Sequence, residues 1–326
     1  MNIYPNTQCA NFCTWLIANS NIRLTPARKI QVQNVQTAAN TGGYVTQLYF
    51  ESFVAYTNRF YQQYVQYITQ YPAAPMPTAY DAATTAWLAN VSSPAQETIY
   101  AVDAFFKQLR ADGNLLLDYF FLFAQDQQAN ARISLVNSGS FVVTEHNSPV
   151  WTTNLGYTGN GTNIYLSTNY TDSSSSVNYT LNSGMYGCYL RNVVGAGAKV
   201  NMGAYNGTTG TLLATNLTGG VIEGLINNNS SFSAGAVGTQ GLFSVVRTGS
   251  TTTNIYKNGT SVATNAGAAT ALVNYADYIM CFSSSGGATD YDTNQYTCAF
   301  KGSGAINMVT FNSAVNLLMT NLGAHY

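Results

Sequence analysis

The chain has 326 residues, a formal net charge of -1 at pH 7 and a charged share of only 8%. It carries no basic stripe that could neutralise phosphates, which argues against binding to nucleic acid. A hydrophobic share of 46%, with 13% aromatic residues, excludes a disordered chain and suffices for one large domain or two medium ones.

The first 77 residues are predicted to form an arm and a long helix that serve in assembly and anchoring. Residues 1–43 carry Arg23, Arg28 and Lys29 and no acidic residue. They are either a solvated basic arm or an anchoring arm that contacts another subunit. Between residues 44 and 71, apolar side chains recur every three to four positions. This spacing predicts a helix that buries one face, within the subunit or in a homo-oligomer.

Residues 78–127 are predicted to form a helical connector. A short helical segment around Trp87 precedes a longer helix, for which Ser93 is the predicted N-cap. The pair Asp-Gly at 112–113 ends that helix. The apolar run 115–123 then predicts a buried strand that leads into a sheet.

Residues 128–326 are predicted to form one domain, because short strand patterns alternate there with turns rich in Gly, Asn and Ser. This is the pattern of an all-β sandwich, and its size suits a two-sheet jelly roll. The clearest unit is the hairpin 243–262, in which Asn258 and Gly259 supply the positive φ angles of a two-residue turn. Further strands are predicted at 141–144, 164–167, 177–181, 187–191, 200–205, 221–226, 278–282, 297–301 and 305–311, and a final helix at 312–322 capped by Gly323.

The end of the chain has a characteristic order. A hairpin with the sequence Ile-Tyr-x-Asn-Gly-x-x-Val precedes a strand flanked by glycines and a terminal helix. This order resembles the C-terminal half of the laminin-G and concanavalin-A-like jelly rolls. The matching residues are Ile255, Tyr256, Asn258, Gly259, Val262, Gly302, Gly304, Ile306, Val309 and Phe311. The resemblance implies an α+β multidomain chain: a helical N-terminal region, then an all-β two-sheet jelly roll (concanavalin-A/laminin-G-like) with a short C-terminal helix.

A second resemblance rests on three short motifs. They are Leu-x-Ala-Asp-Gly at 109–113, Leu-Val-Asn at 135–137 and Gly-Tyr-x-Gly-Asn-Gly at 156–161. Together they resemble a module found at the front of laminin-G-like jelly rolls in structural proteins of tailed phages. The resemblance covers about residues 92–326, whereas residues 1–90 match no family.

The phage resemblance implies a virion structural protein: a head or tail fibre, or a capsid decoration subunit, with an exposed jelly roll that meets a host surface glycan. The expected partners are other virion proteins, through residues 1–77, and further copies of the chain in a homo-oligomer, a trimer by analogy. The expected location is the virion, after synthesis in the cytoplasm of a bacterial host. The alternatives are a non-viral carbohydrate-binding adhesin module and a glycosidase of the same fold.

Catalytic motifs are absent from the sequence. Glycosidases with the concanavalin-A-like fold take their two carboxylates from a Glu-x-Asp-x-x-Glu type run on one strand, and this chain has no such run. A nucleophile elbow, a phosphate-binding loop and a dinucleotide fingerprint are absent as well. We therefore expect no enzyme, and substitutions of Glu145 and Glu223 would test a glycosidase.

The five cysteines predict no metal site. Cys9 and Cys13 have no further Cys or His nearby, so zinc is not expected. Cys281 and Cys298 are either a disulfide between strands or small buried side chains. The chain opens on a polar stretch and contains no apolar run of membrane-spanning length. Neither a signal peptide nor membrane insertion is therefore expected.

Two sets of residues are candidates for binding. Asp290, Asp292 and Asn294 offer oxygen ligands at alternating positions, which suits calcium, the one cofactor considered. The alternative for this segment is a solvated turn held by Asx hydrogen bonds. The second set consists of aromatic residues in loop-like contexts that could stack on a sugar ring or serve only in packing. Its members are Tyr157, Tyr165, Tyr291 and Tyr296.

Overall fold

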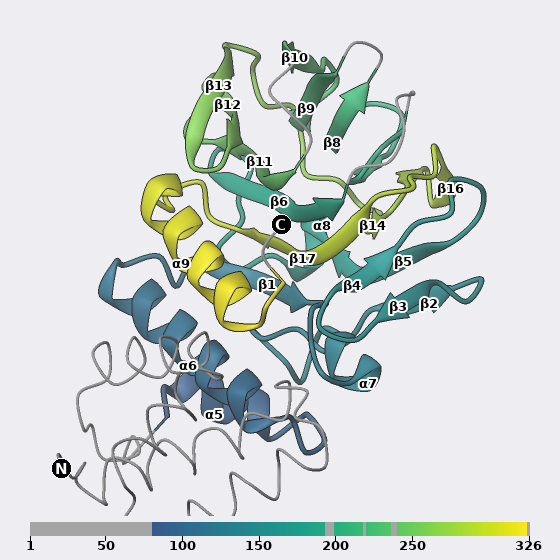
Figure 1. Ribbon diagram of the computed structural model, residues 1–326. Coiled ribbons are helices and arrows are strands. Elements are labelled where there is room, and N and C mark those ends of the chain that lie inside the picture. The colour runs from purple at the N-terminus through teal and green to yellow at the C-terminus, as the bar shows by residue number, and fades with distance from the viewer. Residues whose placement is uncertain (1–79, 193–198, 218–219, 236–239, 325–326) are drawn as a thin grey trace, which may run out of the picture. The chain divides into compact units, whose positions relative to one another are not determined.

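The computed structural model describes residues 80–192, 199–217, 220–235 and 240–324, which belong to one compact unit, Tyr80–Tyr326 (Figure 1). The arm predicted for residues 1–43 and the long helix predicted for residues 44–71 lie outside the described residues. Cys9 and Cys13 lie outside them as well. The described part of the chain forms two mainly antiparallel sheets, with helices packed on one of them.

The first sheet has eight strands, in the order β13-β12-β11-β6-β17-β4-β3, with β1 paired to β17. All its pairings are antiparallel. The strands are β1 (Leu117–Leu122), β3 (Val150–Thr152), β4 (Gly156–Thr158), β6 (Gly184–Asn192), β11 (Gly241–Arg247), β12 (Thr253–Lys257), β13 (Thr260–Asn265) and β17 (Gln295–Gly302).

The second sheet has nine strands, in the order β10-β9-β8-β7-β14-β5-β2, with a short hairpin of β15 and β16 attached to β7. The pairing of β15 with β7 is parallel. The strands are β2 (Thr144–His146), β5 (Tyr165–Thr171), β7 (Met202–Tyr205), β8 (Gly210–Leu217), β9 (Val221–Asn228), β10 (Phe232–Ala234), β14 (Ala276–Ile279), β15 (Phe282–Ser284) and β16 (Gly287–Thr289).

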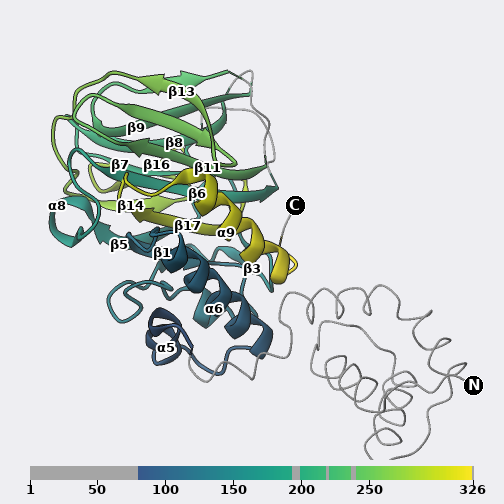
Figure 2. The same cartoon turned by 90° about the vertical axis from the view of Figure 1, so that its left-hand side faces the viewer.

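Two hydrophobic cores separate three layers. Helices α6 (Gln96–Ala111) and α9 (Met308–Asn321) cover the outer face of the first sheet and run alongside each other, and α5 (Ala82–Leu88) packs against α6 (Figure 2). Aromatic residues such as Phe105, Phe300 and Phe311 fill this outer core. The second core lies between the two sheets. Because both faces of the first sheet are covered, every residue of β1 and β11 is buried. Two single-turn helices, α7 (Gln128–Ala131) and α8 (Asp172–Ser175), lie in loops.

The predicted jelly roll with a short C-terminal helix is confirmed. Its central hairpin is present as β11, β12 and β13, and Asn258 and Gly259 adopt φ angles of 48° and 78° in the turn between β12 and β13. The positive φ angles match the requirement of a two-residue hairpin turn. The buried strand predicted at 115–123 is β1.

The strand predicted at 305–311 is wrong. These residues form the N-cap and first turn of α9, because the Asn307 side chain accepts hydrogen bonds from the amides of Val309 and Thr310. Met308 and Phe311 then begin a buried stripe that continues at helical spacing through Val315 and Leu318. The alternation of apolar residues at the start of this stretch is equally compatible with one face of a helix.

The strand predicted at 177–181 is also wrong. The amides of Val177, Asn178 and Tyr179 donate to the buried carboxylate of Asp118, at 3.2, 2.7 and 3.1 Å. A loop that satisfies its amides on a carboxylate has no need of a neighbouring strand. In this segment the structure has one isolated bridge, between Thr180 and Ser183.

The predicted boundary between residues 127 and 128 falls inside the compact unit. β1 pairs with β17 along most of its length, and α6 contributes to the same core as α9. The helical connector is therefore part of the sandwich unit, which begins at Tyr80. A fragment that started at residue 128 would lack one strand and two helices.

Cys188, Cys281 and Cys298 are free, buried thiols, so the alternative of small buried side chains is confirmed for the predicted pair. Burial raises the pKa of each of these thiols. Among the helices of the described residues, none has both the length and the hydropathy to cross a membrane.

Candidate functional site

Aromatic side chains form a row on the outer face of the second sheet. Strands β2, β5 and β14 are neighbours in this sheet (Figure 1). His146 of β2 lies opposite Tyr165 of β5, and Tyr278 of β14 lies opposite Ser167 of β5. Leu166, the residue between Tyr165 and Ser167, packs into the core between the sheets. Since side chains alternate along a strand, the three rings share the face that points away from the core.

The rings of this row contact one another closely. His146 stacks on Tyr165 with ring centroids 4.1 Å apart and planes 2° from parallel. Tyr278 lies on Tyr165 at 4.7 Å, and Tyr291, from the segment between β16 and β17, lies 6.2 Å from Tyr165. We call His146, Tyr165, Tyr278 and Tyr291 the aromatic row. Tyr165 is in its centre, so the ring faces that a ligand can meet belong to the residues at its ends.

Hydrogen bonds hold one end of the aromatic row in place. The hydroxyl of Tyr278 donates to the carbonyl of Gly286 at 3.0 Å, and that of Tyr291 donates to the carbonyl of Ala288 at 3.1 Å. Both carbonyls belong to the β15–β16 hairpin. On β7, the residue opposite Tyr278 is Gly203, which has no side chain to place beside the ring. A Cβ there would lie 2.2 Å from the Thr211 carbonyl oxygen. This end of the row is therefore fixed.

Neutral polar groups lie next to the aromatic row on the same face. Asn169 donates to the Val142 carbonyl at 2.8 Å and to the Thr144 hydroxyl at 2.9 Å, and the Ser167 hydroxyl donates to Asn169 at 3.2 Å. Burial lowers the pKa of His146, so its imidazole is neutral at pH 7. The surface thus combines apolar ring faces with uncharged hydrogen-bonding groups.

Two of the four predicted sugar-stacking tyrosines cannot reach a ligand. Tyr157 and Tyr296 are each 0% exposed, and both rings pack into the core between the sheets. The Tyr157 hydroxyl donates to the Glu145 carboxylate, and the Tyr296 hydroxyl donates to the Asp292 carboxylate. The physical reason is that both side chains point from the first sheet toward the second, into the core between the sheets. Tyr165 and Tyr291, in contrast, come together in the aromatic row.

Asp290 and Asp292, two of the three residues predicted as calcium ligands, do not converge. The Asp292 carboxylate points into the core, where it accepts hydrogen bonds from Tyr296, from Asn201 at 2.7 Å and from the Thr293 amide at 2.7 Å. Burial raises the pKa of Asp292, against the effect of these hydrogen bonds. Asp290 is exposed and accepts from the Thr289 hydroxyl at 2.9 Å. In the described part of the chain, no three His, Cys, Asp or Glu side chains gather in a way that could hold a metal ion.

Sequence reasoning missed His146 and Tyr278 as members of the row. The available signal was strand parity: Tyr278 lies next to Ile279, which packs into the core. Adjacent residues on a strand point to opposite faces, so a buried Ile279 places Tyr278 outside. His146 becomes recognisable only through its register with Tyr165.

Glu145 and Glu223 do not form a glycosidase pair. Glu145 accepts hydrogen bonds from Tyr157 and from Gln128, the latter at 2.9 Å. Glu223 is on β9, and the strand order β9-β8-β7-β14-β5-β2 places four strands between it and Glu145. At about 4.8 Å per strand this corresponds to roughly 24 Å, whereas a glycosidase holds its two carboxyl groups about 5–10 Å apart.

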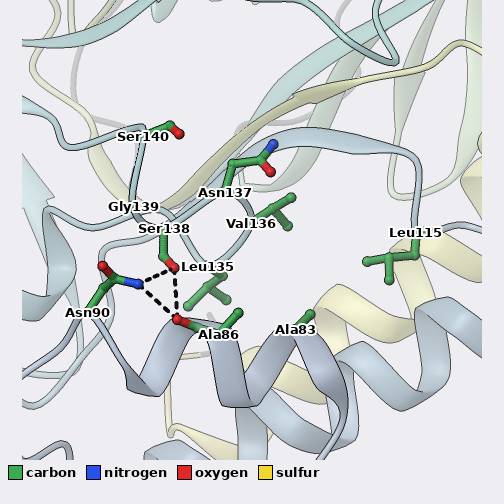
Figure 3. Close-up of a pocket in the computed structure, with 10 residues that line it drawn as sticks. All are labelled: Ala83, Ala86, Asn90, Leu115, Leu135, Val136, Asn137, Ser138, Gly139 and Ser140. Carbon is green, nitrogen blue, oxygen red and sulfur yellow. Dashed lines mark hydrogen bonds between the residues drawn. The ribbon is translucent and has the colours of Figure 1, made fainter.

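A hollow of about 350 Å³ lies between α5 and the segment 135–140 (Figure 3). Its polar groups bond mainly to one another: Asn90 donates to Ser138 at 3.0 Å, and both side chains donate to the Ala86 carbonyl, at 2.9 and 3.1 Å. No aromatic or charged residue lines it. These bonds fasten α5 to the loop, and the aromatic row remains the stronger candidate for ligand binding.

No protein-family model matches the chain, and no curated protein matches it. Solved structures with a similar arrangement include the CBM40 of the Ruminococcus gnavus IT-sialidase, at 12% identity and a TM-score of 0.31, over 39% of this chain and 78% of that one. The binding domain of botulinum neurotoxin serotype D has 10% identity and a TM-score of 0.43, over 61% and 52%. The leech intramolecular trans-sialidase has 11% identity and a TM-score of 0.32, over 49% and 25%.

The match thus spans about half the length of the toxin domain and a quarter of the leech enzyme. At these identities the comparison concerns the fold alone, and the fold is established by the two sheets described above. What the site does is argued from its own residues.

Proposed function

We propose that the β-sandwich is a carbohydrate-binding module that holds its ligand on the aromatic row. The observation that carries the proposal is the alignment of His146, Tyr165 and Tyr278 across three adjacent strands of an outer sheet face. A sugar ring has an apolar face of C–H groups and an edge of hydroxyls. The ring faces at the ends of the row suit the first, and an exposed neutral side chain such as Asn169 suits the second.

The proposed module is non-catalytic. The row contains neither a carboxylate pair nor a nucleophile with a base, and its imidazole is stacked on a tyrosine ring. The low charge of the chain also favours a neutral ligand over one drawn in by an electrostatic field.

A glycan array with the full-length chain tests the proposal. We expect at least one glycan to be retained, and the His146→Ala and Tyr278→Ala variants to bind it about two- to tenfold more weakly, since a stacked ring contributes about 0.5–1.5 kcal/mol. The matched control is Tyr100→Ala, which removes a half-buried tyrosine from α6, the helix that packs on the first sheet. Because the predicted calcium ligands Asp290 and Asp292 do not converge, a chelator is expected to leave binding unchanged. Retention of no glycan, or equal binding by all variants, would overturn the proposal.

We further propose that the module belongs to a phage virion structural protein. Its support is the sequence resemblance of residues 92–326 to a module of tailed-phage structural proteins. In this proposal residues 1–77 contact other virion proteins and close a homo-oligomer, a trimer, and the host surface glycan meets the aromatic row.

The oligomer is testable by the solution mass of the full-length chain at micromolar concentration. We expect three times the chain mass of 35.0 kDa. A fragment that begins at Tyr80, where the compact unit begins, is expected to be monomeric. A monomeric full-length chain would contradict the trimer, whereas an oligomeric fragment would move the assembly contacts into the sandwich.

A further inference from the structure

A lysine and two aspartates form a fully buried cluster between the sheets. Lys301 of β17 is 0% exposed, and Asp172 and Asp277 are each 1% exposed. The Lys301 Nζ atom contacts the carboxylate of Asp172, which directly follows β5 as the first residue of α8, and lies 2.7 Å from Oδ2 of Asp277 on β14. The amine of one sheet thus meets two carboxyl groups of the other.

The walls of this cluster exclude water. The rings of Tyr179, Tyr170 and Tyr186 lie 4.6, 5.3 and 5.6 Å from the Lys301 Nζ atom, measured to their centroids. All three tyrosines are buried. The position of Lys301 is energetically costly, because taking an ion pair out of water costs several kcal/mol per ion.

The two carboxyl groups differ in their hydrogen bonds. Asp277 is anchored, since it accepts from the Thr211 hydroxyl at 3.2 Å, from the Tyr119 hydroxyl at 3.4 Å and from Lys301. Asp172 contacts Lys301 through Oδ1, whereas its buried Oδ2 has no hydrogen-bond partner among the described residues. Asp172 is therefore a carboxyl group that is held against an amine by one oxygen and left unsatisfied at the other.

We infer that Lys301 and Asp172 condense to an intramolecular amide bond that joins the two sheets, with Asp277 carrying the protons. Asp277 accepts a proton from the Lys301 ammonium and passes it to the Asp172 oxygen that will leave. The Nζ lone pair then attacks Cγ of Asp172, so that an N–C bond forms. A second Nζ proton moves through Asp277 to the departing hydroxyl, the C–O bond breaks and water is released.

The atoms and protons of this step balance without any reagent from outside the protein. One ammonium and one carboxylate are consumed, one amide and one water are formed, and Asp277 returns to its initial state without any oxidant or reductant. Burial raises the pKa of Asp172 to about 7, against the lowering effect of Lys301 and with a further upward contribution from Asp277, and the raised pKa favours the neutral acid that the attack requires. Burial lowers the pKa of Lys301 and the two carboxylates raise it, with a raised pKa as the result. The ammonium proton therefore has to pass to Asp277, inside the cluster.

Proximity and desolvation favour the reaction over the ion pair. The amine and the carboxyl group are held in contact by two sheets, which replaces an encounter in solution by an intramolecular step. The product is a neutral amide, so two buried charges disappear from the core. Its remaining N–H lies where Asp277 Oδ2, at 2.7 Å from Nζ, can accept a hydrogen bond.

The intact mass of the denatured full-length chain tests the inference. We expect a mass lower than that of the sequence by one water, and a branched peptide that joins the segments around residues 172 and 301. The Lys301→Met variant is expected to have its full sequence mass. The Lys107–Asp103 pair, with 2.6 Å between nitrogen and oxygen but a 48% exposed lysine side chain, is the internal control and should remain unlinked.

The Asp172→Asn variant identifies the acceptor. Its side-chain amide releases ammonia in place of water and yields the same branched peptide. The Asp277→Asn variant can no longer shuttle protons and should leave most chains unlinked. A branched peptide that contains residue 277 would reassign the acceptor and overturn the separate roles of Asp172 and Asp277. A wild-type chain with its full sequence mass would overturn the bond itself.

Discussion

Replacement of Asp118 by alanine is expected to lower the free energy of unfolding by about 4 kcal/mol, because a hydrogen bond to a buried charge contributes about 1.5–3 kcal/mol and its lost partners remain unsatisfied. The Asp118 carboxylate is 0% exposed and accepts from the amides of Val177, Asn178 and Tyr179 and from the Tyr170 hydroxyl, at 2.7 to 3.2 Å. Alanine would leave four donors without an acceptor. Chemical denaturation of the full-length chain, followed by tryptophan fluorescence, measures the change.

Two further variants separate the effect of losing the hydrogen bonds of Asp118 from the effect of losing a negative charge. Asp118→Asn keeps one carbonyl oxygen and is expected to cost about half as much, since its amide N–H₂ cannot accept from the loop. Asp112→Ala removes an aspartate whose hydrogen bond to Gln108 is in a solvent-exposed position, and we expect a change within about 0.5 kcal/mol. An Asp118→Ala variant as stable as Asp112→Ala would show that the 177–179 loop is held by other contacts.

Local sequence patterns predicted the elements whose conformation depends on residues that are close in the sequence. The turn at Asn258 and Gly259 was predictable because only a few residue types adopt positive φ angles at low cost. The buried strand β1 was predictable because five of its six residues are apolar, so neither face of the strand suits contact with solvent. The strand predicted at 177–181 was wrong because its amides are satisfied by Asp118, about 60 residues earlier, and such a partner leaves no local trace.

The candidate site was half predictable for a related reason. Aromatic residues in a low-charge chain indicated stacking, but which tyrosines face outward depends on the strand register that places each side chain on the core face or the outer face of its sheet. Tyr296 is buried because its side chain points from the first sheet into the core between the sheets, whereas Tyr165 is on the face of the second sheet that points away from that core. The cluster around Lys301 could not be predicted, since its members lie on strands β17 and β14 and directly after β5, and a charged residue in a strand ordinarily predicts an exposed position.

Replacement of Arg247 by methionine is expected to lower the free energy of unfolding by about 3–5 kcal/mol, because it leaves buried carbonyl groups unsatisfied and opens space in the core. Arg247 is at the end of β11 and is 0% exposed. Its guanidinium donates to the Ile226 carbonyl of the other sheet at 2.9 and 3.1 Å. It also donates to the carbonyls of Gly249, Ser250 and Gly267, at 3.3, 2.9 and 3.1 Å. Burial lowers the pKa of Arg247. One side chain thus fastens two loops and both sheets.

The geometry of the guanidinium, and not its charge alone, is the source of this stability. Arg247→Lys preserves the charge but offers one compact ammonium, which cannot reach carbonyls on four residues at once, so it is expected to be nearly as destabilised as Arg247→Met. Arg110→Met provides the contrast: that arginine is 54% exposed and bonds to Asp81 at 2.8 Å, and its loss should cost about 1 kcal/mol or less. Equal unfolding midpoints for the Arg247→Met and Arg110→Met variants would contradict the role of Arg247 as a link between the sheets. Loss of a side chain that bonds to buried carbonyls of both sheets must lower the stability more than loss of a surface ion pair does.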